Sequence, residues 1–99
     1  MGYNNPIAGC RIRDKAHHIK ERFPDDRHTI DLLMMQDPDF CAICEDHDAC
    51  VNALNYWIDS DAPEADLRVG EYRTLIKDLE KEAAQAIGAL KNRLNRREI

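Results

Sequence analysis

Apolar positions in the second half of the chain follow a helical repeat on either side of a short bend. Before the bend, steps of four and three residues separate the seam positions Phe40, Cys44, His47, Val51, Leu54 and Ile58. After it, a second series consists of Tyr72, Ile76, Leu79, Ala83, Ala86, Leu90 and Leu94. Such spacing places one stripe of a helix against a partner helix. We predict two helices, over residues 38–58 and 63–95, that close into an antiparallel hairpin.

The ends of these two helices carry recognisable signals. Asp37 precedes Pro38, which puts a good N-cap residue before a proline at the first helical position. The bend runs from Asp59 to Pro63, and Asp61 is a candidate cap for the last helix. Across so short a connection, residues whose numbers sum to about 121 would lie opposite one another, so that Phe40 would lie near Lys81.

The N-terminal third predicts less regular structure. Residues 1–10 contain two glycines and one proline, so we expect them to be irregular or disordered. A short basic helix is predicted from Arg11 to Phe23, where Pro24 stops it. Asp25 or Asp26 could then cap a second short helix whose apolar face is Ile30, Leu33 and Met34. If that helix continues in line with the central one, this face covers the far end of the last helix.

No stretch alternates apolar and polar residues in the way that a strand does. The 99 residues therefore predict a single all-α domain, built from the hairpin and one or two short N-terminal helices. Because two helices bury only one stripe each, we expect self-association to complete the bundle. The residues expected at helix or subunit contacts are Phe40, Val51, Leu54, Trp57, Ile58, Tyr72, Ile76, Leu79 and Leu90.

The distribution of charge and the hydropathy of the chain limit the classes of partner that it can bind. Residues 24–66 carry one basic and twelve acidic groups, whereas residues 1–23 and 67–99 each have a net charge of +3. The acidic centre argues against nucleic acid, although Lys91, Arg93, Arg96 and Arg97 leave a weaker option at the C-terminal end. No apolar run approaches the roughly 18 residues needed to cross a bilayer. We expect a homodimer or a tetramer. A further protein partner is compatible with this sequence, whereas association with a membrane is not expected.

The four cysteines are Cys10, Cys41, Cys44 and Cys50. No basic-then-apolar signal peptide is visible at the N-terminus, and three of these cysteines lie in one stretch of ten residues inside a helical pattern. We therefore expect reduced thiols and a cytoplasmic location.

The region from His28 to Leu54 resembles the YdcH-like family of small bacterial proteins of unknown function. The residues that carry the resemblance are Ile30, Leu33, Asp37, Phe40, Ile43, Glu45 to His47, and Leu54. Residues 75–80 look like the second helix of that family, so the likeness covers about half the chain. Four cysteines, a tryptophan and extra segments at both ends depart from the family pattern. The resemblance implies a helical hairpin and offers no activity or cofactor to transfer.

One group of residues could carry thiol chemistry. Cys41 and Cys44 form a CxxC in the opening turns of the central helix, where the helix dipole favours thiolate, and Cys50 could act as a third thiol. Against this, redox CxxC motifs normally follow a strand, and the nearby carboxylates of Asp39, Glu45, Asp46 and Asp48 oppose thiolate formation. The alternative is that Cys44 is a small core residue and Cys41 its partly covered neighbour.

Metal binding is the second candidate chemistry. Cys41, Cys44 and His47, or Asp48 in place of His47, lie on adjacent helical turns, and His17, His18 and His28 could approach from the N-terminal segment. A second CxxC and the Glu-x-x-His pattern of di-iron bundles are both missing. A histidine on an apolar seam is otherwise a hydrogen-bonded core residue.

No catalytic triad, phosphate-binding loop or dinucleotide fingerprint is present. The sequence thus predicts a helical interaction or regulatory protein that is not an enzyme and needs no cofactor. The alternative function is thiol-redox or metal-binding chemistry at Cys41, Cys44, His47 and Cys50.

Overall fold

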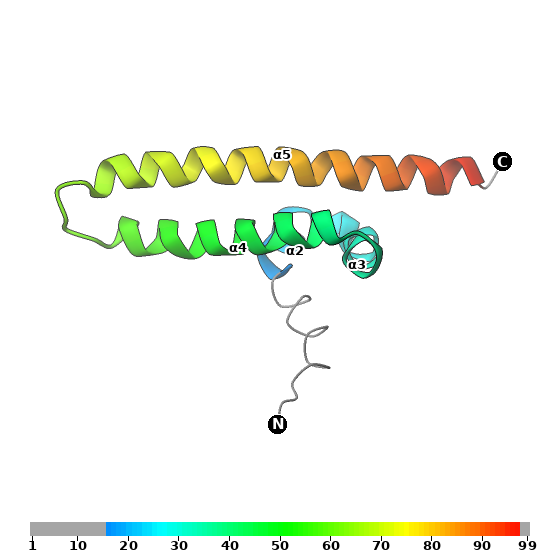
Figure 1. Ribbon diagram of the computed structural model, residues 1–99, viewed down its shortest axis with the longest axis horizontal. Helices are drawn as coiled ribbons and strands as arrows, with labels where there is room; N and C mark the ends of the chain where they lie inside the picture. The colour runs from blue at the N-terminus through cyan, green and yellow to red at the C-terminus, as the bar shows by residue number, and fades with distance from the viewer. Residues whose placement is uncertain (1–15, 98–99) are drawn as a thin grey trace, which may run out of the picture.

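Two long antiparallel helices dominate the protein, whose computed structural model describes residues 16–97 (Figure 1). They are α4 (Pro38–Ile58) and α5 (Ala65–Arg97), and they lie side by side. The described residues contain no strand. The predicted all-α hairpin is therefore confirmed, with the last helix beginning at Ala65 rather than at Pro63.

Three short elements precede the hairpin. They are α2 (His17–Arg22), the 3₁₀ turn η1 (Pro24–Asp26) and α3 (Arg27–Gln36). Pro24 ends α2 as expected, because it cannot continue the hydrogen-bond ladder. The predicted irregular segment 1–10 and the first residues of the predicted basic helix lie outside the described residues.

The Asp37–Pro38 step begins α4 as the sequence predicts. One oxygen of the Asp37 carboxylate accepts hydrogen bonds from the backbone N–H groups of Asp39 at 3.0 Å and Phe40 at 3.2 Å. Asp26 occupies the N-cap position of α3 without any side-chain capping bond. Its carboxylate instead accepts a hydrogen bond from Nζ of Lys91, 2.9 Å away, and so fastens η1 to α5.

The helix α3 does not continue in line with α4. Figure 1 shows α3 nearly end-on, so it crosses the hairpin instead of extending it. The physical reason is that a proline disfavours the helical conformation in the residue before it. Asp37 is accordingly extended, with φ −128° and ψ 99°, and the chain turns sharply there.

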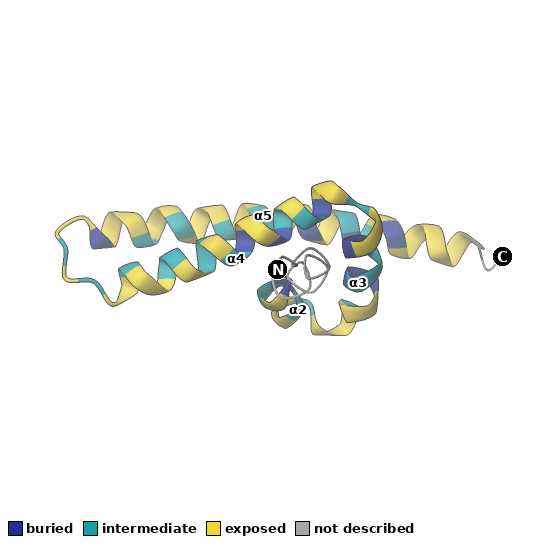
Figure 2. Ribbon diagram, turned by 60° about the horizontal axis from the view of Figure 1, so that its bottom comes forward, coloured by how far each residue is buried: buried dark blue, intermediate teal, exposed yellow. Residues whose placement is uncertain are grey.

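The hydrophobic core lies at one end of the hairpin, where α2 and α3 cover it (Figure 2). Ile30, Leu33 and Met34 are buried there, as predicted, although α3 reaches the site by crossing. Leu94, which was expected to be covered as well, remains 37% exposed. The full set of buried core residues is Ala16, Ile19, Ile30, Leu33, Met34, Phe40, Cys44, Ala83, Ile87 and Leu90.

The other end of the hairpin, towards the α4–α5 connection, has little cover. Exposed and half-buried residues prevail there in Figure 2, and Ala65 is the one buried residue of the stretch 48–82. We call this stretch the distal hairpin. Its sides are the part of the fold that a partner could cover.

The pairing of α4 with α5 differs from the expected register. The sequence estimate places His47 opposite Thr74, whereas its imidazole contacts Glu80, with 3.0 Å between Nε2 and Oε2. Side chains on a helix lean towards its N-terminus, so in an antiparallel pair the two side chains lean in opposite directions along the common axis. The late start of α5 and this lean together shift the contacts.

Candidate functional site

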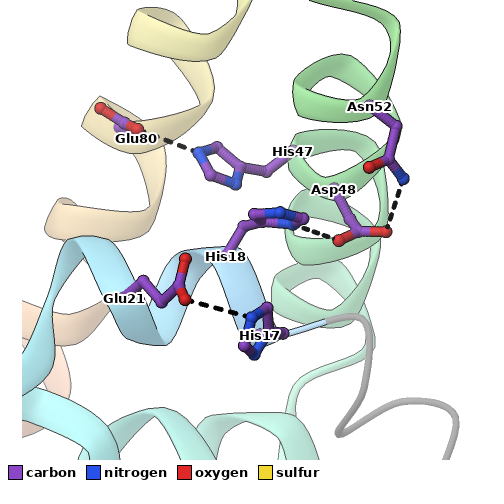
Figure 3. A network of polar contacts seen from close by, with 7 residues as sticks. All are labelled: His17, His18, Glu21, His47, Asp48, Asn52 and Glu80. Carbon is purple, nitrogen blue, oxygen red and sulfur yellow. Dashed lines mark hydrogen bonds and ion pairs between the residues drawn. The ribbon is translucent and has the colours of Figure 1, made fainter. Parts of the chain in front are cut away.

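A network of histidines and carboxylates joins α2 to the two long helices (Figure 3). His18 on α2 pairs through Nδ1 with the carboxylate of Asp48 on α4. His47 on α4 pairs with Glu80 on α5. The rings of His18 and His47 are tilted neighbours, with centroids 6.5 Å apart. These contacts place one polar cluster at the junction of three helices.

Glu80 is the hub of this network. Its two carboxylate oxygens accept separate hydrogen bonds, from Nε of Arg22 and from Nε2 of His47, each at 3.0 Å. Burial by itself would raise the pKa of Glu80, but the hydrogen bonds from His47 and Arg22 outweigh it and hold that pKa below its ordinary value. Glu80 is therefore a carboxylate that links α2, α4 and α5 at neutral pH.

His47 is almost fully buried, with 2% of its side chain exposed. Its Nδ1 atom has no hydrogen-bond partner within the described part of the chain. A proton on Nδ1 would be a buried donor without an acceptor, so the arrangement best satisfies the tautomer protonated on Nε2, which donates to Glu80. His47 is therefore a buried core histidine that is hydrogen-bonded to Glu80.

The three predicted metal candidates, Cys41, Cys44 and His47, are used elsewhere. The Cys41 thiol donates to the backbone oxygen of Met34 at 3.2 Å, Cys44 is fully buried in the core, and His47 faces Glu80. Of the histidines considered as further ligands, His18 does approach His47. However, no three histidine, cysteine or acidic side chains among residues 16–97 are arranged to hold a metal ion. The polar contacts of this network link α2, α4 and α5 to one another.

The three cysteines within the described residues resist ionisation. Burial, reinforced by the neighbouring Cys41, raises the pKa of the Cys44 thiol to about 12. Burial first, and then the charges of Glu45 and Asp37, raise the pKa of Cys41. Burial and Asp46 raise that of Cys50. Since thiolate is the reactive form, these environments disfavour nucleophilic thiol chemistry at neutral pH.

The predicted contact residues separate into three groups by their exposure. Phe40 and Leu90 are buried within the protein and belong to its core. Ile58 is 51% exposed. The remaining six are half-buried in the distal hairpin: Val51, Leu54, Trp57, Tyr72, Ile76 and Leu79.

A groove of about 390 Å³ runs between α4 and α5 in the distal hairpin. Its apolar residues are Ala49, Cys50, Leu75 and Leu79, and its acidic residues are Asp46, Asp78 and Glu82. We call it the acidic groove. Leu75 is 46% exposed there, which makes the groove a surface with apolar and negatively charged parts side by side.

Sequence reasoning missed the pairs His18–Asp48, His47–Glu80 and Arg22–Glu80. The partners are separated by 30, 33 and 58 residues respectively. Only the hairpin register and the docking of α2 bring them together. The one available signal was the polarity of His47 on an otherwise apolar seam.

Comparison with known proteins finds no matching protein-family model, no similar curated protein and no similar solved structure. The described residues form no helix that is both long and apolar enough to cross a membrane.

Proposed function

We propose that this protein acts through protein–protein contact and that its first partner is a second copy of the same chain. The observation that carries the proposal is the uncovered distal hairpin. Large apolar residues such as Leu75, at 46% exposed, lie there beside half-buried neighbours, while the core gathers at the other end. Burying apolar surface stabilises by about 25 cal/mol per Å², so covering this region favours association.

Charge also favours a second copy. The α4 helix carries four acidic residues and neither lysine nor arginine, whereas α5 has eight basic and five acidic residues. Two copies can therefore offer each other surfaces of opposite sign. A helical bundle assembled from two hairpins is the simplest product, and a tetramer remains the alternative.

The competing thiol or metal function has less support, because the thiol pKa values are raised and the candidate ligands diverge. The three described cysteines are free, which suits a reducing compartment and favours a cytoplasmic location. Kinship with YdcH-like hairpin proteins also remains a proposal, supported by the resemblance and by the helical hairpin. It adds no catalytic role.

Sedimentation equilibrium over a range of protein concentrations tests self-association. We expect a reversible dimer, whose dissociation constant this concentration series measures. A wild-type protein that stays monomeric at about 100 μM, well above a micromolar dissociation constant, would contradict the proposal.

A further inference from the structure

The exposed flank of α5 has a charge pattern that distinguishes its two halves. Steps of three and four residues connect seven positions, which therefore form one stripe on the helix. These positions are Leu75, Asp78, Glu82, Ala86, Ala89, Arg93 and Arg96. Ala86 is half-buried and the other six are exposed. We call this set the α5 stripe.

The first half of the α5 stripe belongs to the acidic groove. Leu75, Asp78 and Glu82 line it from α5, and Asp46 adds a third carboxylate from α4. The second half is basic, with Arg93 and Arg96 towards the end of α5, and Arg93 also lines a shallow pocket with Asp37 of its own chain. Within the described residues, none of the side chains of Asp78, Glu82, Arg93 and Arg96 forms a hydrogen bond or an ion pair.

We propose that two copies of the chain pair antiparallel along the α5 stripe, so that the basic half of each copy lies over the acidic groove of the other. This inference rests on the proposed self-association and specifies its geometry. A two-fold interface uses the same surface on both copies, so that surface must be complementary to itself. A parallel pair would set Asp78 against Asp78 and Arg93 against Arg93. Only the antiparallel pair joins opposite charges.

One register pairs six of the seven stripe positions, from Asp78 to Arg96, and leaves Leu75 outside the contact. When Glu82 lies opposite Arg93 of the second copy, Asp78 lies within one residue of Arg96 of that copy. The same register puts Ala86 opposite Ala89 at the centre. Two small side chains there allow the helices to approach at the short end of the usual range of about 8–10 Å. The arginines of the second copy then reach the carboxylates at the acidic groove from above.

Charge reversal on both sides of this contact tests the geometry. The acid-reversed variant is Asp78→Lys/Glu82→Lys, and the base-reversed variant is Arg93→Glu/Arg96→Glu. All four positions are exposed, so both variants should keep the fold, which circular dichroism can check. Each variant alone should dimerise at least about tenfold more weakly than wild type, because attractive pairs become repulsive at two symmetric contacts.

Mixing the two variants is the decisive step. In the mixed dimer both contacts again join opposite charges, so the affinity should return to within about threefold of wild type. The control is Asp59→Lys/Asp61→Lys, which makes the same change of charge in the exposed connection between α4 and α5. It should dimerise like wild type. If a double variant fails to fold, Glu82→Lys and Arg93→Glu, which face each other in this register, provide the same test.

The outcomes separate the two proposals. Loss in each variant and recovery in the mixture support antiparallel pairing. A wild-type dimer that neither reversal weakens, or a mixture that does not recover, overturns this geometry and leaves self-association standing. A wild-type protein that never associates overturns both.

Discussion

Glu80 shows how one carboxylate can hold three helices together. It accepts hydrogen bonds from Arg22 and His47, so α2, α4 and α5 meet at its two oxygens. The side chain of Glu80 is 18% exposed, and bonds of this kind to a charged group are stronger than those between neutral groups. The residue therefore ties α2 to the hairpin.

The lowered pKa of Glu80 predicts how stability depends on pH. Because the carboxylate is favoured in the folded state, its contribution is fully present above the ordinary glutamate pKa of 4.5 and is lost as the pH falls through the lowered folded value. We expect Glu80→Gln to lower the free energy of unfolding by about 1–2 kcal/mol at pH 7. The difference from wild type should shrink with acidification. Urea denaturation at a series of pH values measures it.

The matched control for this prediction is Glu64→Gln, which removes an exposed carboxylate from the α4–α5 connection. Its pH profile should run parallel to that of wild type. A Glu80→Gln profile that is also parallel to wild type would show that the network does not stabilise the fold.

At the scale of the elements, the start of α4 depends on Asp37. Its carboxylate satisfies two backbone N–H groups that have no partner within the helix, and Pro38 fixes the backbone of the first helical residue. The extended conformation of Asp37 also separates α3 from α4. One residue therefore begins one helix and sets the direction of the element before it.

Removing this cap should destabilise the protein measurably. We expect Asp37→Ala to lower the free energy of unfolding by about 1 kcal/mol, since both backbone donors lose their acceptor. Asp37→Asn keeps an acceptor oxygen and should stay close to wild type. Chemical denaturation of both variants, at equal protein concentration, provides the comparison; equal losses would argue for a role of the charge instead of the cap.

At the scale of the whole molecule, stability is unevenly distributed along the hairpin. Phe40 is fully buried among α3, α4 and α5 residues, whereas Val51 is only half-buried in the distal hairpin. A truncation at a fully buried position loses apolar contact and leaves a cavity, while a half-buried position loses less.

This uneven burial predicts that two truncations in the same helix lower the free energy of unfolding by different amounts. Phe40→Ala should lower the free energy of unfolding by about 3–5 kcal/mol. Val51→Ala should cost about 1 kcal/mol, because less surface is uncovered. Urea denaturation at one fixed protein concentration is required, since the proposed dimerisation would also contribute to stability. Similar losses in both variants would mean that the distal hairpin is as well packed as the core.

The same uneven burial along the hairpin links the fold to the proposed function. The short N-terminal helices cover the hairpin at the end that holds the core. The two flanks of the distal hairpin remain exposed. Its acidic groove and the basic end of α5 carry opposite charges on one stripe. We propose association for this reason, since the rest of the chain gives the long hairpin only limited cover.

The sequence by itself determined the two helices of the hairpin and both ends of α4. The heptad spacing of Phe40, Cys44 and Val51 predicts α4, and Asp37 with Pro38 predicts its start to the residue. These features are local, because helical periodicity and capping depend on neighbours three or four positions away. The buried face of α3 was also predictable, since its apolar residues share one side of a helix.

The tertiary structure alone decided the crossing of α3, the register of the hairpin and the contacts of Glu80. These depend on how side chains lean between antiparallel helices and on where the chain turns at Asp37. Arg22 and Glu80 are 58 residues apart, and no local pattern joins them. Long-range polar pairs of this kind depend on the positions that the packed apolar faces give to the helices.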